Sequence, residues 1–287
     1  MNKKVNDIIS VLEKYIKSDF SAVKNDFSSI QEIRLTVNKP VLITKENRIY
    51  SIGSSLLSFE NIRNIFSAFC EYSVHTYQKE ICEGFITSEG GIRIGICGTA
   101  VYENQKISNI KDISSLNIRI PHEINGCAER LEKFDRGILI IGPPCSGKTT
   151  LLRDYARIKS KNSRLVIVDE RMEIAGIYRG IPCFDIGFSS VMNGFNKCDG
   201  IKMAVRSMSP DYIICDEFGD EDDINSAVYA MKSGAKIVAI IHSSDKEDLM
   251  SKPLFSKILS LKIFDCFVFL DRSCKIKEIY SETEMLT

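Results

Sequence analysis

The stretch "RGILIIGPPCSGKTTLLRD", residues 136–154, carries the strongest structural signal in this chain of 287 residues. Its apolar run Ile138–Ile141 predicts a buried strand, and Thr150–Asp154 is typical of a helix. Between them lies the pattern G-x-x-x-x-G-K-[ST] at Gly142–Thr149. A glycine-rich loop between a strand and a helix is suited to hold a polyphosphate, so we expect a P-loop (Walker A) here.

Each part of this loop has a chemical use. Gly142 and Gly147 let backbone N–H groups turn inward on a phosphate, and the following helix adds its positive end. Lys148 would neutralise β- and γ-phosphate oxygens, and Thr149 would offer its hydroxyl to Mg²⁺. The expected nucleotide-binding residues are Gly142, Pro143, Pro144, Cys145, Ser146, Gly147, Lys148, Thr149 and Thr150. A fortuitous glycine-rich turn is the alternative, and the flanking strand and helix disfavour it.

The composition is that of an ordinary globular protein. Lys plus Arg and Asp plus Glu both total 38, so the net charge argues against a surface that coats DNA or seeks membranes strongly. The ten cysteines form no C-x-x-C pair, and we interpret them as reduced and structural. The first residues lack a signal-peptide pattern, and no run approaches the roughly 20 apolar residues of a membrane span. We therefore expect a cytoplasmic chain that works at a membrane only through a partner.

The rhythm of the sequence changes near residue 125. Before it, helical spacing alternates with short β-rich runs, which predicts an α+β domain over residues 1–125. The expected elements are a helix at Val5–Ile16, a helix capped by Ser58 and running to about Tyr72, a helix at Tyr77–Glu83, and a hairpin turning at Ser88–Gly91. The apolar stripe of the first helix could dock on a membrane partner, but a stripe facing the protein's own core is favoured.

After residue 125 apolar strands alternate with helices. The strands are "GILIIG", "RLVIVD", "DYIICDE", "KIVAIIH" and "CFVFLD". Strands of this kind separated by helices predict a parallel-rich sheet covered on both faces. The second domain is thus expected over residues 126–287.

Two of these strands end in an Asp-Glu pair, Asp169-Glu170 and Asp216-Glu217. Phosphoryl transfer needs an acid at a strand end for the metal and a group that orients water. In P-loop proteins with a strand inserted between the phosphate-loop strand and the metal-acid strand, the second pair is the Walker B pair. We therefore assign Asp216 to water-mediated Mg²⁺ binding and Glu217 to activation of the attacking water; a strand-terminal helix cap is the alternative for each pair.

His242 closes the strand "KIVAIIH" at the edge of the sheet where α/β proteins bind ligands. We interpret it as a γ-phosphate sensor, with a purely structural histidine as the alternative. His75 and His122 have no partner at metal-ligand spacing and are expected to be structural.

Two short patterns imitate a GTPase. "NKCD" at Asn196–Asp199 and "DEFG" at Asp216–Gly219 match the guanine-reading N-K-x-D and the switch D-x-x-G. In a GTPase D-x-x-G comes first, and N-K-x-D follows at the end of a strand. Here the order is reversed and no apolar strand precedes "NKCD", so the GTPase interpretation is rejected.

With these motifs in order, the chain resembles the secretion-type ATPases of the type II and type IV systems, and most closely the stage III sporulation AA family of endospore-forming bacteria. The resemblance covers most of the chain from about residue 30 onward, and "VDERMEIAG" and "RSMSPD" are its most specific parts. The stretches that carry it are "EIRLTVNKP", "YSVHTYQKEICEGFITSEGGIRIGICGTAV", "IKDISSLNIRI", "GPPCSGKTTLLRDYARI", "VDERMEIAG", "VRSMSPDYIICDE" and "LMSKPLFSKIL".

The resemblance implies a RecA-like ATPase domain in a ring, usually a hexamer, with ATP and Mg²⁺ between subunits. It also implies functional roles for the acidic box at Asp169, Glu170 and Glu173. Arg93 and Arg119 match positions where relatives place interface arginines, and Arg206 is a third candidate for stabilising transition-state charge. Surface or core-rim ion pairs are the alternative for each arginine.

The combined interpretation is an ATP-hydrolysing motor subunit. Its membrane-embedded partners, and a peripheral location on the mother-cell side of the forespore envelope, are implied by the resemblance alone. Two alternatives remain open: a nucleotide-gated docking module with little turnover, and a RecA-like DNA motor. The balanced net charge argues against a nucleic-acid partner.

Overall fold

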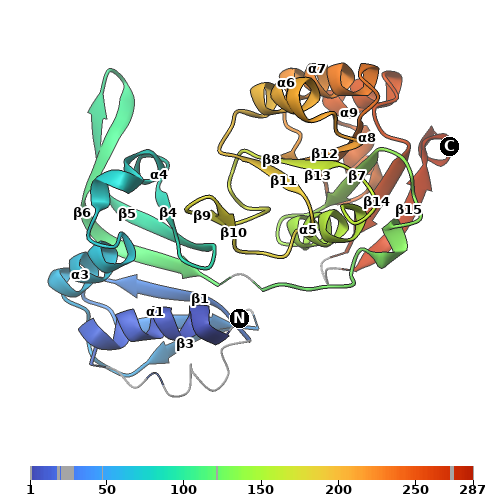
Figure 1. The fold of residues 1–287 in the computed structure, drawn as a ribbon. Coiled ribbons are helices and arrows are strands. Elements are labelled where there is room, and N and C mark those ends of the chain that lie inside the picture. Colours follow the sequence, from blue (N-terminus) through green and yellow to red (C-terminus); the bar gives the residue numbers. More distant parts are fainter. Residues whose placement is uncertain are drawn as a thin grey trace. The chain divides into compact units, whose positions relative to one another are not determined.

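The computed structural model describes residues 2–17, 20, 29–46, 48–120, 122–271 and 275–286. The chain divides into two compact units (Figure 1). The first comprises Met1–His122 and Tyr178–Cys183, and the second comprises Glu123–Ile177 and Phe184–Thr287. The second unit holds the phosphate loop and both acid pairs.

The first unit is built on a six-stranded antiparallel sheet with the strand order β3-β2-β1-β6-β5-β4. Its elements are α1 (Asn2–Tyr15), β1 (Ile30–Thr36), β2 (Val41–Lys45), β3 (Arg48–Ile52), α3 (Phe59–Phe69), η2 (Val74–Tyr77), α4 (Gln78–Cys82), β4 (Phe85–Ser88), β5 (Ile92–Glu103) and β6 (Lys106–Arg119). The predicted hairpin at Ser88–Gly91 is confirmed, because it joins the antiparallel strands β4 and β5.

Helices α1 and α3 contribute their apolar faces to the core of this unit. Ile8, Ile9 and Leu12 of α1 are buried there, which supports the interpretation that its stripe faces the protein's own core. Ser58 caps α3 as predicted, since its hydroxyl accepts the Asn61 N–H. However, α3 ends at Phe69 and not near Tyr72. Tyr72 has a positive φ of 59°, a left-handed conformation that cannot continue a helix.

The second unit is a seven-stranded sheet with the order β11-β8-β12-β13-β7-β14-β15. All neighbouring pairs run parallel except β14 and β15. The elements that follow β6 in the chain are η3 (Glu129–Leu131), β7 (Ile138–Gly142), α5 (Lys148–Lys159), β8 (Leu165–Asp169), β9 (Ile177–Tyr178), β10 (Ile181–Pro182), β11 (Ser190–Asn193), α6 (Lys197–Met208), β12 (Tyr212–Glu217), α7 (Glu221–Lys232), β13 (Lys236–His242), α8 (Lys246–Met250), α9 (Pro253–Ser260), β14 (Cys266–Leu270), β15 (Ile276–Ser281) and α10 (Glu282–Leu286). Strands β9 and β10 pair with each other in a two-stranded sheet, and Tyr178–Cys183 is part of the first unit.

The strands of this sheet are apolar along their whole length because both faces are covered. Alternate residues of β7 enter different cores: Leu139 and Ile141 pack with α6, α7 and α9, whereas Ile138 and Ile140 pack with α5. Figure 1 shows α5 on one face of the sheet and α6 and α7 on the other. The predicted α/β architecture with a parallel-rich sheet is confirmed.

The strand order also confirms the inserted strand. Strand β13 lies between β7, which leads into the phosphate loop, and β12, which ends in Asp216-Glu217. The carboxyl ends of parallel strands meet at one edge of a sheet. The loop, the acid pair and His242 are therefore brought to the same edge.

Candidate active site

The phosphate loop makes a tight turn before α5. Cys145 and Gly147 adopt positive φ angles of 62° and 80°, and Gly147 caps the helix. A Cβ on Gly142 would lie 2.5 Å from the Ser146 hydroxyl, so this position leaves no space for a side chain. The loop therefore has the curled backbone that turns N–H groups toward an anion.

Lys148 is buried at the start of α5, with 4% of its surface exposed. Its ammonium donates to the carbonyl oxygens of Gly142 (2.9 Å) and Pro143 (2.7 Å). Burial lowers the pKa of Lys148, while the charge of Glu217 acts to raise it. The ammonium group of Lys148 is thus held by carbonyl oxygens of the phosphate loop, close enough to Glu217 to feel its negative charge.

His242 connects the lysine with the acid pair. Its Nδ1 lies 2.9 Å from the Lys148 ammonium, and its Nε2 lies 3.4 Å from a Glu217 carboxylate oxygen. Burial, and then the charge of Lys148, lower the pKa of His242. A neutral imidazole accepts from the ammonium at Nδ1 only with its proton on Nε2, facing Glu217. Sequence-separated residues 148, 217 and 242 therefore form one chain of contacts.

Asp216 is 5% exposed, one residue before the end of β12. Burial raises its pKa to about 6, and Lys197 acts in the opposite direction. One of its oxygens accepts the backbone N–H of Arg171 at 3.2 Å. The Arg171 side chain reaches Glu217 at 3.3 Å, so the segment after β8 contacts both acids.

The two acids of the other pair, Asp169 and Glu170, make different contacts. Asp169 is fully buried and accepts the N–H groups of Glu173, Ile174 and Ala175, so it organises the loop that follows β8. This is the cap-like alternative for Asp169. Glu170 instead extends toward the second pair, with a carboxylate oxygen 3.9 Å from the ammonium of Lys197.

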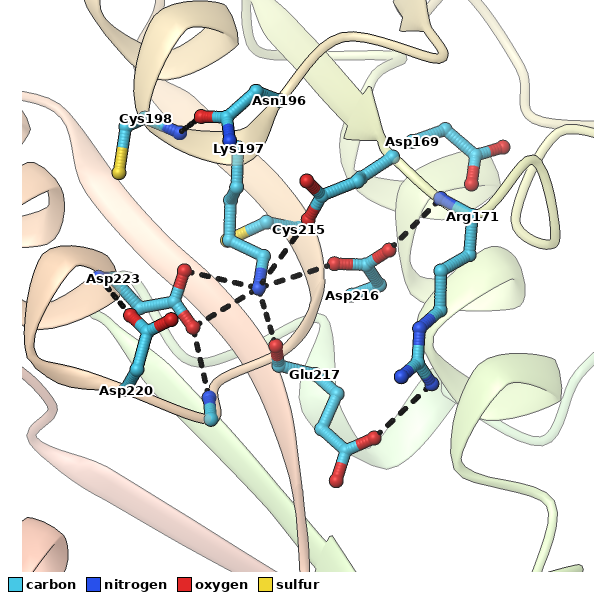
Figure 2. Close-up of polar contacts among 12 residues, drawn as sticks. Asp169, Arg171, Asn196, Lys197, Cys198, Cys215, Asp216, Glu217, Asp220 and Asp223 are labelled. Atoms are coloured by element: carbon cyan, nitrogen blue, oxygen red, sulfur yellow. Dashed lines mark hydrogen bonds and ion pairs between the residues drawn. The ribbon is translucent and has the colours of Figure 1, made fainter. Parts of the chain in front are cut away.

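Lys197 lies at the centre of the acidic group in Figure 2. In the sequence this lysine is noticeable only as part of the rejected "NKCD" pattern, which predicts no contact with the acids for it. A signal existed, because Asn196 is a typical helix N-cap and a lysine at the next position opposes the helix dipole. Around it is a cavity of about 420 Å³, lined by Glu170, Arg171, Asn196, Lys197, Cys198, Asp216, Glu217, Gly219, Asp220, Asp222 and Asp223.

The candidate arginines are in different places. Arg206 lies exposed on α6 of the second unit. Arg93 and Arg119 belong to the first unit, where they are direct partners across β5 and β6. Arg93 stacks on the Phe85 ring at 3.8 Å, and Arg119 is exposed.

The residues present fit a magnesium-bound polyphosphate. The Ser146 hydroxyl is buried in the loop without a hydrogen-bond partner. Within the described ranges, no three His, Cys, Asp or Glu side chains gather as a metal site. Mg²⁺ usually takes one or two protein oxygens and completes its shell with phosphate and water, so Thr149 and Asp216 are sufficient as a protein donor set.

Comparisons with known proteins give the family and the fold of the chain. A family model described as sporulation stage III, protein AA matches residues 2–285. Stage III sporulation protein AA of Bacillus subtilis (strain 168) is 35% identical over 283 residues, which cover 94% of this chain and 92% of that protein.

Two solved ATPase structures share the fold. The Legionella pneumophila ATPase DotB is 16% identical, with a TM-score of 0.58 over 86% of this chain and 74% of that one. The pilus retraction motor PilT, solved with bound ADP, is 16% identical, with a TM-score of 0.58 over 88% and 78%. The chain thus has a fold similar to that of DotB and PilT. The family match over nearly the whole chain gives the identity: the chain belongs to the sporulation stage III protein AA family.

Proposed function

We propose that this protein is an ATP-hydrolysing motor subunit of a secretion-like complex that acts during sporulation. The observation that carries the proposal is the contact chain from Lys148 through His242 to Glu217. It joins a phosphate-binding lysine to a carboxylate at the edge where α/β sheets bind ligands. The family membership and the ATPase fold support the same conclusion.

Each residue has a distinct task in this proposal. The loop amides and Lys148 bind the phosphates, and Lys148 leaves the carbonyls of Gly142 and Pro143 to do so. Mg²⁺, held by Thr149 and through water by Asp216, would neutralise charge on the phosphate oxygens. Glu217 orients the attacking water. His242 contacts both Lys148 and Glu217, so it couples phosphate binding by Lys148 to the position of the Glu217 carboxylate.

The wider context is part of the proposal. Rings of this fold would form ATP sites between subunits, and Arg93, Arg119 or Arg206 would supply charge from a neighbour. We infer partners in a membrane-embedded complex between mother cell and forespore. No helix in the part of the chain that the structure describes is long and apolar enough to cross a membrane, so such a link would be made through those partners.

Glu217→Gln tests the proposed hydrolysis. The amide keeps the size of the side chain but cannot activate water as a carboxylate does, so ATP binding should persist while phosphate release falls at least about 100-fold. Binding is measured with a fluorescent ATP analogue, and turnover by phosphate release. Glu221→Gln is the matched control, since Glu221 is exposed at the start of α7, where it forms an ion pair with Lys257.

Equal phosphate release by Glu217→Gln and the parent protein would contradict the role of Glu217. A parent protein that binds ATP tightly but releases no phosphate would instead support a nucleotide-gated docking module. Turnover that rises with DNA and loses this response at high salt would favour a DNA motor.

A further inference from the structure

Lys197 occupies a position that is unfavourable for a lysine. It is the first residue of α6, and only 6% of its surface is exposed. The N-terminus of a helix carries partial positive charge, which repels an ammonium group. Burial adds a large cost for any charge that is not paired. The groups around Lys197 must therefore compensate for both effects.

The compensation comes from residues at the end of β12 and the start of α7 (Figure 2), and from Glu170 directly after β8. The ammonium lies 3.0 Å from Asp223, 3.5 Å from Asp216 and 3.9 Å from Glu170. It also donates to the backbone carbonyl of Glu217. Although burial acts to lower the pKa of Lys197, the surrounding negative charge shifts it upward overall.

These contacts fasten the chain on both sides of Glu217. Before it, Lys197 pairs with the Asp216 carboxylate, and at Glu217 itself it holds the carbonyl. After it, Asp223 accepts the N–H of Gly219 at 2.8 Å. Because these contacts hold the backbone around Glu217, they also set the direction of its side chain. The Glu217 carboxylate lies 3.4 Å from His242 Nε2.

We propose that Lys197 is a positioning residue of the hydrolytic site, which holds the Asp216 carboxylate and the Glu217 backbone in the geometry that hydrolysis needs. The inference rests on the proposed function. Lys197 acts through these two acids and not on the nucleotide itself. The same role explains "NKCD" without guanine recognition: Asn196 caps α6 by accepting the Cys198 N–H, and Lys197 turns inward to the acids.

Lys197→Met removes the charge while nearly keeping the length of the side chain. We expect kcat to fall about 100-fold, the loss typical of misplaced catalytic groups, while KM for ATP changes less than about 3-fold. ATP affinity in EDTA should be unchanged, because the phosphate loop is intact, but the Mg²⁺ concentration needed for half-maximal turnover should rise. Lys202→Met is the matched control, as the same substitution at an exposed position of the same helix.

A structural role alone gives a different pattern. Folded Lys197→Met with kcat within about 3-fold of Lys202→Met, and with the same Mg²⁺ concentration for half-maximal turnover, overturns the proposal even if its melting temperature falls. Asp223→Asn is the second variant, because it weakens the shortest ion pair of Lys197 and keeps the volume. It should show the same split between kcat and KM, and an unchanged kcat would likewise overturn the proposal. A parent protein without turnover overturns the proposed function as well, so the two failures are distinguishable.

Discussion

Among single residues of the site, His242 has a pKa that depends on both burial and a neighbouring charge. His242 accepts from the Lys148 ammonium, and burial together with that ammonium lowers its pKa from the ordinary 6.5. The imidazole is therefore held neutral between a cation and the carboxylate of Glu217. Protonation of His242 would place two positive groups 2.9 Å apart.

This arrangement predicts a dependence of stability on pH. Because the pKa of His242 is lower in the folded protein than in the unfolded chain, the unfolded chain takes up the proton first as the pH falls below about 6.5. Acid should therefore destabilise the parent protein more than His242→Gln, which cannot take up that proton. Melting temperatures at pH 7.5 and 5.5 test this: the advantage of the parent over the variant should shrink at pH 5.5. A pH-independent difference would contradict the proposed neutral state.

At the scale of elements, the distance between α6 and the sheet determines where Lys197 lies. Gly200 faces β8, and a Cβ built on it would lie 2.5 Å from a methyl group of Val168. Both residues are on the buried side of α6 and β8. The glycine thus permits the close approach that carries Lys197 to the acids.

Gly200→Ala should consequently destabilise the protein, although alanine is the better helix former by about 1 kcal/mol. Overpacking against Val168 should cost about 1–3 kcal/mol, measured by urea unfolding. Met203→Ala, at an exposed position of α6, should change the free energy of unfolding by less than about 0.5 kcal/mol. Adding Val168→Ala should recover part of the loss; a stabilising Gly200→Ala would show that α6 is free to move outward.

At the scale of the whole molecule, the chain passes between its two units at residues 122–123, 177–178 and 183–184. The segment Tyr178–Cys183 belongs to the first unit, where Arg179 forms an ion pair with Glu71. It follows closely after the loop that Asp169 organises. Movement of the first unit would therefore act, through the covalent chain, on the loop after β8 that Asp169 organises.

The proposed ring adds a prediction about arginines. Arg93 and Arg119 stand opposite each other on β5 and β6, and Glu32 of β1 stands opposite Arg119 on its other side. In the proposed ring, the Arg119 guanidinium would stabilise the charge that develops on a nucleotide bound by the neighbouring subunit. Arg119→Ala should bind ATP normally and lose about 1000-fold in turnover. If the arginine acts on a neighbouring subunit, mixing Arg119→Ala with Glu217→Gln should restore up to about a quarter of parent turnover, since random mixing pairs intact halves at that frequency. A mixture no more active than its components would contradict action between subunits.

Much of this fold was predictable because its strands, loops and caps are local. The apolar strands, the phosphate loop and the Ser58 cap follow from neighbouring residues, and the strand order placed β13 as expected. By contrast, β11 is not among the strands that the sequence predicts, and it forms because it pairs with β8. Nothing in the sequence marks Tyr178–Cys183 as part of the first unit.

The site divides in the same way. Motifs predict Lys148 and the Asp216-Glu217 pair as site residues, His242 is predicted from its place at a strand end, and the structure brings Lys148, Glu217 and His242 into contact. Lys197 and Arg171 were missed because their partners lie far away in the sequence: Lys197 meets Asp216 across 19 positions and Arg171 meets Glu217 across 46. Buried charge networks depend on such tertiary contacts, which local patterns do not record.

The most direct test of the central claim is a crystal structure of the protein with Mg²⁺ and a non-hydrolysable ATP analogue. We expect the triphosphate in the loop Gly142–Thr149, the Lys148 ammonium turned toward it, and the metal between Thr149 and the Asp216 carboxylate. A nucleotide bound elsewhere, or a metal remote from Asp216 and Glu217, would refute the proposed hydrolytic site.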